Sequence, residues 1–443
     1  MSEKRRVLIV SFFYPPNPAV GGLRVAKFAR YLPEFGWTPT VLTARAEAGT
    51  AGAGPANVVA TRFLSPWNLV PGRRRTTPAT VSLRERAARR GRIGGSAYRA
   101  LRHLLPMSSV RMPDATLGWV PFAVAEGRRL IDSGDFDAIL SSAGPPSSHI
   151  VAARLQRRSR LPWIADYRDL WSDNLWDLRI GAFRRLERRL ERRVLHGAAL
   201  LTTVAPTWAE RLRQLHQLHQ RDVEVVYNGF DPSDYPAQPR PATQFVLTYV
   251  GTLIRPHQDP EPLFRALALL GSRSTLDLER SSFQVRFLGT APAAVADLAE
   301  RHGVAHLVSY FPPIPHRECL AEQAAATALL FLGWRDPQLG WISAKLFEYL
   351  GAARPVLAVG PPGGEASRIL RECGLPDLSD DPSTIARRLE GWLREFARSG
   401  SLGPQTRPGA AERYTRRAQT GRLARLLDEQ AVVAGRRVGQ TNV

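Results

Sequence analysis

The fold is decided by residues 7–43, which read VLIVSFFYPPNPAVGGLRVAKFARYLPEFGWTPTVLT. They open with Val7-Leu-Ile-Val10, a continuous apolar run rich in β-branched residues, which is typical of a strand buried on both faces of a parallel sheet. Residues 23–35 follow with helical apolar spacing and end near Gly36, and residues 41–43 predict the next strand. A strand, a helix and a second strand in this order predict a βαβ unit.

The same alternation continues along the chain. A proline-rich connector at residues 232–241 precedes a second cycle, which opens with the buried-type strand pattern of residues 245–250 and closes it with Gly251. Further strand patterns lie at residues 138–140, 163–165, 200–204, 223–227, 285–288, 308–311, 329–332 and 356–359.

These patterns predict an α/β protein with two Rossmann-like, doubly wound domains. The 443 residues are too many for one ordinary domain and suffice for two. We place the N-terminal domain at residues 1–240 and the C-terminal domain at 241–400. A helical segment follows at 401–443, and the sequence does not decide whether it crosses back to the N-terminal domain. Ligands of such sheets bind at the carboxyl ends of the strands, so we expect a site in a cleft between the domains.

Composition limits the classes of function. The formal net charge is +21, but among 61 basic residues only Lys4, Lys27 and Lys345 are lysines, which is typical of a GC-rich genome. The charge therefore indicates anionic partners such as nucleotides, sugar diphosphates, lipid phosphates or a membrane surface. We predict no nucleic-acid binding, because no basic motif with interleaved aromatic residues is present.

The cysteines and the apolar runs indicate the compartment. Cys319 and Cys373 give neither a disulfide framework nor the spacing of a zinc site, so we expect a reducing cytoplasm. The apolar run after Lys4-Arg5-Arg6 is too short for a signal peptide, and no run approaches the roughly 20 residues of a membrane span. Peripheral contact with the anionic inner face of a membrane stays open.

Two arginine-rich segments have different patterns. Residues 73–111 are either a solvated basic helix with flexible flanks or an amphipathic surface that docks on anionic lipid or a lipid-linked acceptor. Residues 184–193 form a cleaner helix pattern, with Leu186, Leu190 and Val194 on one face and Glu–Arg pairs on another. We interpret this second helix as structural.

The chemistry is most visible in residues 343–356, SAKLFEYLGAARPV. Lys345 and Glu348 are three residues apart on a predicted helix, so they share a face close to its beginning. A cation for a diphosphate and a carboxylate for ribose hydroxyls would thus lie side by side. The alternative is an ordinary surface ion pair.

This segment resembles the donor-binding motif of family 4 retaining glycosyltransferases of the GT-B fold, in the subgroup whose motif reads like K-x-x-E-Y-L with a proline following. The other landmarks of the family occur in the same order: Tyr14-Pro-Pro16 with Gly21-Gly22, Ser141–Pro146, Asp166–Trp171, Asn228–Asp231 and Gly251. The resemblance covers nearly the whole chain.

The resemblance implies transfer of a sugar, with retention, from a UDP- or GDP-sugar to a glycan or lipid-linked acceptor in cell-surface polysaccharide or glycolipid biosynthesis. Lys345 would stabilise the charge that grows on the leaving diphosphate, and Glu348 would bind the ribose. The implied catalytic residues are Arg255, Lys345 and Asp166. The implied donor-binding residues are Gly21, Gly22, Gly251, Ser343, Lys345 and Glu348. Acceptor-binding residues would be Ser142, Arg168 and Asp169. For Asp166, Arg168 and Asp169 the alternative is a buried ion-pair cluster that braces the loop.

Three positions depart from the family pattern. Gly340 stands where the family has its first glutamate, and Thr252 and Gln258 stand where it has an arginine and a lysine. Arg255, together with Lys345, is a candidate to replace the lost charge. The alternative function is therefore a catalytically degenerate nucleotide-sugar-binding or scaffold protein. We expect no cofactor and no metal. Asp135 and Asp137 have the D-x-D spacing of metal-dependent transferases, but they precede a strand of the N-terminal domain, whereas the donor is expected in the C-terminal domain.

Overall fold

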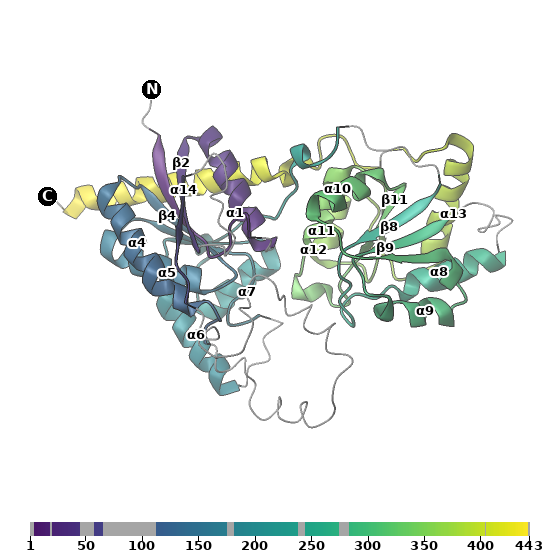
Figure 1. The fold of residues 1–443 in the computed structure, drawn as a ribbon, viewed down its shortest axis with the longest axis horizontal. Helices are drawn as coiled ribbons and strands as arrows, with labels where there is room; N and C mark the ends of the chain where they lie inside the picture. The colour runs from purple at the N-terminus through teal and green to yellow at the C-terminus, as the bar shows by residue number, and fades with distance from the viewer. Residues whose placement is uncertain are drawn as a thin grey trace. The chain divides into compact units, whose positions relative to one another are not determined.

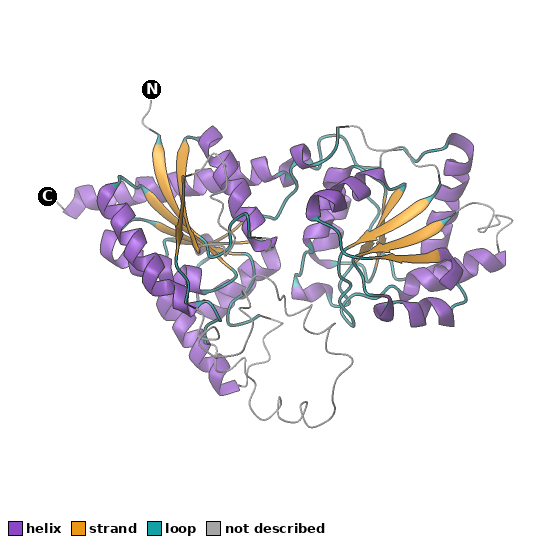
Figure 2. Cartoon of the chain, viewed as in Figure 1, coloured by secondary structure: helices purple, strands orange, loops and turns teal. Residues whose placement is uncertain are grey.

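The computed structural model describes residues 4–17, 20–44, 57–64, 112–174, 181–237, 244–273, 283–403 and 405–441. The chain forms two units, Met1–Tyr227 with Gln419–Val443, and Asn228–Ala418 (Figure 1). Each unit is a parallel sheet covered by helices (Figure 2). The predicted pair of Rossmann-like α/β domains is confirmed.

The N-terminal unit is built on a seven-stranded parallel sheet of order β3-β2-β1-β4-β5-β6-β7. Its central strand β1 contains the predicted run Val7–Val10, in which every side chain is fully buried. Ile9 lies opposite Val41 on one neighbour and Leu140 on the other. The strands are β1 (Arg5–Val10), β2 (Trp37–Ala44), β3 (Asn57–Thr61), β4 (Ala138–Ala143), β5 (Trp163–Tyr167), β6 (Leu200–Thr203) and β7 (Val223–Val225).

Helices cover both faces of this sheet. The described helices are α1 (Val20–Tyr31), α4 (Val120–Ser133), α5 (Ser147–Ser159), α6 (Gly181–Leu195), α7 (Pro206–His216) and α14 (Arg416–Thr441). One core joins β1 and α1 to Leu423 and Leu427 of α14. The end of the chain is therefore part of the N-terminal unit, because α14 supplies apolar side chains to its core.

The C-terminal unit contains a five-stranded parallel sheet of order β10-β9-β8-β11-β12. Its strands are β8 (Val246–Val250), β9 (Gln284–Leu288), β10 (Val308–Phe311), β11 (Ala328–Leu332) and β12 (Val356–Val359). Its helices are α8 (Glu261–Arg273), α9 (Ala296–Arg301), α10 (His316–Ala325), α11 (Ala344–Ala352), α12 (Gly364–Glu372) and α13 (Pro382–Ser399). Glycine follows β8, β9, β11 and β12 directly, which lets the loops at this edge approach one another closely.

The boundary between the units differs from the predicted position near residue 240. The division falls after Tyr227, because the start of the connector packs on the C-terminal unit. Phe230 N donates to Tyr414 O at 3.2 Å, and the Tyr235 hydroxyl donates to Glu348 O at 2.7 Å. These contacts assign residues 228–237 to the second unit, although their composition is that of a linker.

Helix α6 is helical as predicted, and its buried face contains two carboxylates. Glu187 and Glu191 are buried, whereas Leu186 is 51% exposed. The Tyr167 hydroxyl donates to Glu191 Oε1 at 2.9 Å, and Trp171 Nε1 donates to Glu187 Oε1 at 2.9 Å. The carboxylates turn inward because these two side chains donate hydrogen bonds to them, and Leu186 is left on the exposed side of the helix.

Candidate functional site

Helix α11 brings Lys345 to the carboxyl end of β8. Ser343 is the N-cap, and its hydroxyl accepts from Lys345 N at 3.4 Å. Lys345 Nζ donates to the Tyr249 hydroxyl at 2.6 Å and to Thr252 O at 3.0 Å. The ammonium also lies 4.3 Å from the centre of the Tyr249 ring, a cation–π distance. One positive charge is thus held at the end of the central strand, beside the beginning of a helix.

Gly251 makes room for this lysine. Its φ is +100°, in the region that favours glycine, and a Cβ added there would lie 2.8 Å from Lys345 Cε. Thr290 Oγ1 donates to Gly251 O at 2.7 Å, which ties the loop after β8 to the loop after β9. Both the backbone conformation and the close approach therefore require a glycine after β8.

Glu348 lies one turn further along α11 and is held by α10. Its Oε1 lies 3.0 Å from His316 Nε2, and its Oε2 accepts from Gln323 Nε2 at 3.1 Å. Burial opposes ionisation of Glu348, but the bonds from His316 and Gln323 and the nearby charge of Lys345 lower its pKa. The hydrogen bond to Glu348 raises the pKa of His316. The carboxylate is therefore ionised and oriented at its 23% exposed position.

The positions that depart from the family pattern have distinct environments. Gln258 is buried; its Nε2 donates to Leu332 O at 2.9 Å and its Oε1 accepts from Ile254 N at 3.2 Å. Thr252 offers its carbonyl oxygen to Lys345. Arg255 is exposed, and its Nη1 donates to Ala294 O at 3.4 Å. Gln258 thus braces two loops, whereas Lys345 supplies the charge beside Thr252.

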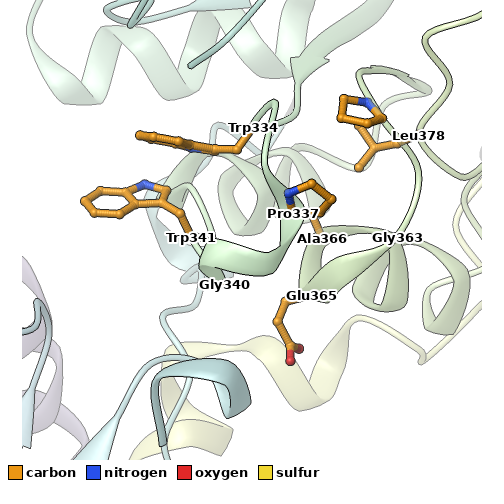
Figure 3. Close-up of a pocket in the computed structure, with 9 residues that line it drawn as sticks. Trp334, Pro337, Gly340, Trp341, Gly363, Glu365, Ala366 and Leu378 are labelled. Atoms are coloured by element: carbon orange, nitrogen blue, oxygen red, sulfur yellow. The ribbon is translucent and has the colours of Figure 1, made fainter. Parts of the chain in front are cut away.

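Gly340 lies in a small pocket beside an aromatic pair (Figure 3). Its φ is +63°, at the end of a 3-10 helix over Pro337–Leu339, so a glutamate there would be strained. The Trp334 and Trp341 rings lie 5.0 Å apart between centroids at an angle of 35°. Glu365, at the rim, points away from these rings and pairs with Arg368 at 2.9 Å.

In the N-terminal unit, Asp166 forms a buried ion pair. It is fully buried at the end of β5, and both oxygens contact Arg24 of α1, at 2.8 and 3.0 Å. Ser142 Oγ donates to Oδ2 and Thr202 Oγ1 to Oδ1, each at 2.8 Å. Burial opposes ionisation, yet Arg24 and the two hydroxyls lower the pKa of Asp166. Asp166 thus lies in a buried ion-pair cluster, which was the alternative for it, and Ser142 is one of its hydrogen-bond donors.

Arg168 joins two glycine loops of the same unit. Its Nη1 donates to Gly21 O, and its Nη2 donates to Gly144 O at 2.7 Å. A Cβ on Gly21 would meet the Arg168 guanidinium, which would have to move to make room for it. Gly22 instead approaches the backbone of Tyr14. Asp169 is 40% exposed and lies 3.8 Å from Arg168 Nε.

Other side chains of this unit that could take part in chemistry or stack on a sugar are internal. Burial lowers the pKa of His149 to about 3, and the ring is neutral, with Nδ1 2.8 Å from Ser141 Oγ. Trp163 and Trp171 are in the core. The basic segment 73–111 lies outside the described residues. Within the described ranges, no trio of His, Cys, Asp or Glu is arranged to hold a metal, and no helix has the length and apolarity to cross a membrane.

Sequence reasoning missed several partners that shape the site. His316 and Gln323 hold Glu348, Tyr249 holds Lys345, and Arg24 holds Asp166. Arg24 carried a weak signal, because it lies two residues after Gly21-Gly22, near the beginning of α1. The others carried none, since each contact joins elements distant in the sequence.

The profile of Glycosyltransferase Family 4 matches residues 92–234, which supports the predicted resemblance in this part of the chain. Two curated proteins named D-inositol 3-phosphate glycosyltransferase are similar. That of Streptomyces avermitilis is 27% identical over 231 residues, covering 48% of this chain and 48% of its own length. That of Thermobispora bispora is 29% identical over 256 residues, covering 51% of this chain and 58% of its own. The chain thus spans about half the length of the curated relatives it matches.

Solved structures support the fold over the whole chain. The Anabaena protein Alr3699/HepE, solved in complex with UDP-glucose, has a TM-score of 0.57 at 14% identity and covers 96% of this chain and 99% of its own. This likeness confirms the architecture of two Rossmann-like units.

Proposed function

We propose that this protein is a glycosyltransferase that transfers a sugar from a UDP- or GDP-sugar to a glycan or lipid-linked acceptor, with retention at the anomeric carbon. The single observation that carries the proposal is the arrangement on α11, where Lys345 lies beside Gly251 at the carboxyl edge of a parallel sheet and Glu348 follows one turn further along the helix. The family match and the named activity of the similar curated proteins support the same reaction class.

The diphosphate would bind between Gly251 and Lys345. As the bond from the sugar to the diphosphate breaks, negative charge grows on the leaving oxygen, and a fixed cation lowers the energy of that state. Lys345 is fixed by Tyr249 and Thr252 before any ligand binds, so little reorganisation is required. The amides that open α11 add the positive end of a helix dipole. In this proposal no resident cofactor takes part.

Glu348 would accept the ribose hydroxyls. A carboxylate must be ionised to accept two such bonds, and His316 and Gln323 favour that state. The UDP-glucose bound by the Anabaena structural relative supports a nucleotide-sugar as donor. The proposed setting is the cytoplasm, with peripheral contact at the inner face of the membrane during synthesis of a surface polysaccharide or glycolipid.

The experiment is a thermal-shift screen against UDP, GDP and their sugar conjugates, followed by an assay for transfer and nucleotide release. A ligand at about 100 times its Kd should stabilise the protein by about 2.7 kcal/mol. Glu348→Ala should abolish the shift. Glu390→Ala, which removes a carboxylate paired with Arg394 on α13, is the matched control and should leave the shift intact.

The outcomes separate the two candidate functions. A selective shift with transfer supports the enzyme and identifies the base of the donor. A shift without transfer or hydrolysis supports the degenerate binding protein, which the glycine geometry at position 340 favours. No shift with any nucleotide, in folded protein, contradicts the enzyme and the nucleotide-sugar-binding protein, and it leaves the scaffold protein.

A further inference from the structure

The outer face of the N-terminal unit that α4, α5 and α6 form is unusually rich in arginine. The three helices lie side by side (Figure 1), α4 against α5 and α5 against α6. They carry two, three and six arginines respectively. Arg157 Nη2 of α5 donates to Arg193 O of α6 at 3.4 Å, and Arg158 of α5 reaches Asp132 of α4 at 3.0 Å. We call this surface the arginine face.

The acidic residues of these helices leave most of that charge uncompensated. Glu126 pairs with Arg129 at 2.6 Å and Asp132 with Arg158, while Glu187 and Glu191 are turned into the core. Exposed arginines that form no ion pair with another described residue remain on all three helices, namely Arg128, Arg154, Arg185 and Arg189. The face therefore presents a concentrated positive potential to solvent.

A groove between α4 and α5 gathers part of this charge. Arg128 of α4 and Arg154, Arg157 and Arg158 of α5 line it, together with Pro121, Val124 and Ala125. Guanidinium groups bind phosphate oxygens in a bidentate manner, so four of them around one groove fit a phosphate-bearing headgroup.

Apolar side chains accompany the arginines on α6. Phe183 is 39% exposed and Leu186 is 51% exposed, and both flank the outer side of a helix whose inner side holds Glu187 and Glu191. Phe183 and Leu186 are three residues apart on one helix and are surrounded by arginines, and an apolar patch with a polar rim is typical of a membrane or protein interaction site. Acyl chains cover apolar groups while lipid phosphates pair with arginine, whereas a nucleic-acid backbone satisfies only the charge.

We propose that the arginine face docks the protein on an anionic lipid bilayer, with Phe183 and Leu186 inserted among the acyl chains. The docking helix is therefore α6, the helix interpreted from sequence as purely structural. This proposal specifies the surface for the membrane contact that is part of the proposed function. It rests on the proposed function for the biological reason to dock, whereas the docking itself is independent of transfer activity. Binding to vesicles is measured without donor or acceptor, so loss of transfer activity and loss of docking are separate results.

The test measures partition of the full chain onto sedimented vesicles of three parts phosphatidylcholine to one part phosphatidylglycerol. The test variant changes Arg128, Arg154, Arg185 and Arg189 to glutamine. The control changes Arg265, Arg301, Arg387 and Arg398, exposed arginines of the C-terminal unit, and thus removes the same charge. Each arginine near an anionic surface contributes about fivefold to partition, so the test variant should bind several-hundred-fold more weakly than the control.

A second pair of variants tests insertion. Phe183→Ser with Leu186→Ser keeps every charge and should still weaken partition about tenfold or more, because apolar burial is lost. Changing the four test arginines to lysine should retain most of the binding, which separates charge from folding. Raising salt from about 0.1 M to about 1 M shortens the Debye length from about 10 Å to about 3 Å and should weaken binding of the wild type.

Three outcomes would overturn the proposal. The first is equal partition onto pure phosphatidylcholine vesicles. The second is an equal loss of binding in the control set, which would show a general charge effect. The third is unchanged partition of the Phe183→Ser/Leu186→Ser variant together with tight, salt-dependent binding of a DNA duplex to the arginine face, which would assign that face to nucleic acid.

Discussion

Replacing Asp166 by asparagine would leave Arg24 buried with a charge that nothing nearby neutralises. Arg24 is 1% exposed and Asp166 is fully buried, and two hydrogen bonds of 2.8 and 3.0 Å join them. Removing one partner of such a pair costs about 3–5 kcal/mol, because the other remains desolvated. Since 1 kcal/mol corresponds to about 2–4 °C in a unit of this size, the N-terminal unit should melt about 10 °C lower.

Scanning calorimetry is the suitable assay, because it can resolve the transitions of the two units. The transition of the N-terminal unit should fall, and that of the C-terminal unit should not move. Asp169→Asn is the matched control: this carboxylate is 40% exposed and lies 3.8 Å from Arg168, so its loss should cost less than about 1 kcal/mol. Arg24→Met combined with Asp166→Leu should recover much of the loss, since no unpaired charge remains.

The pH dependence has a definite sign. Because the folded-state pKa of Asp166 is lowered, its stabilisation is complete above the unfolded value of about 3.9 and is lost as the pH falls through the folded pKa. The difference between wild type and Asp166→Asn should therefore shrink in acid. Loss of transfer activity in Asp166→Asn at an unchanged melting temperature would refute the structural assignment and return Asp166 to the chemistry.

Further predictions concern the C-terminal unit. Lys345→Met should lower kcat for nucleotide release about 10²–10³-fold, as expected for a lost charge at the leaving group, with the melting temperature as the control for folding. Gly251→Ala should destabilise the unit by about 1–3 kcal/mol in chemical denaturation, because φ is +100° and Lys345 is close, whereas Gly271→Ala, in open space on α8, should be neutral or stabilising. The hydrogen bond to Glu348 raises the pKa of His316, so this contact contributes below about pH 6.5 and is lost as the pH rises through the folded pKa; His316→Gln should remove that pH dependence from donor binding measured by calorimetric titration.

Strands buried on both faces were predictable, because a continuous apolar run has few other environments. Val7–Val10 and residues 356–359 are examples, and both are strands of fully buried side chains. Strand β3 was missed, since Asn57–Thr61 is a short edge strand that is only partly buried and carries no such run. Apolar periodicity located α6 but not its orientation, because Tyr167 and Trp171 attract its carboxylates inward. The donors come from the end of β5 and the loop after it, so the apolar pattern of the helix does not contain them.

The candidate site was predictable where residues close in sequence share one helix, as Lys345 and Glu348 do. Their partners were not predictable, since Tyr249 comes from β8 and His316 from α10. Arg168 shows the opposite case. The sequence pattern placed it in a binding site, but its guanidinium donates hydrogen bonds to the backbone carbonyls of Gly21 and Gly144. A polar residue after a strand is equally suited to binding a ligand or to bracing a loop. Only its contacts in the folded structure distinguish the two roles.

Thr252 and Gln258 replace the basic residues of the family pattern, and Lys345 explains how a positive charge is still present beside this loop. Gln258 is buried and links Leu332 O to Ile254 N, so a lysine with this backbone would place an ammonium in the core. The cation beside the loop after β8 comes from α11 instead, where Lys345 donates to Thr252 O. The lysine crosses the space that a side chain at Gly251 would fill. The three positions therefore depend on one another. The neutral amide of Gln258 holds the loop after β8, Gly251 leaves space beside that loop, and Lys345 of α11 supplies the positive charge there.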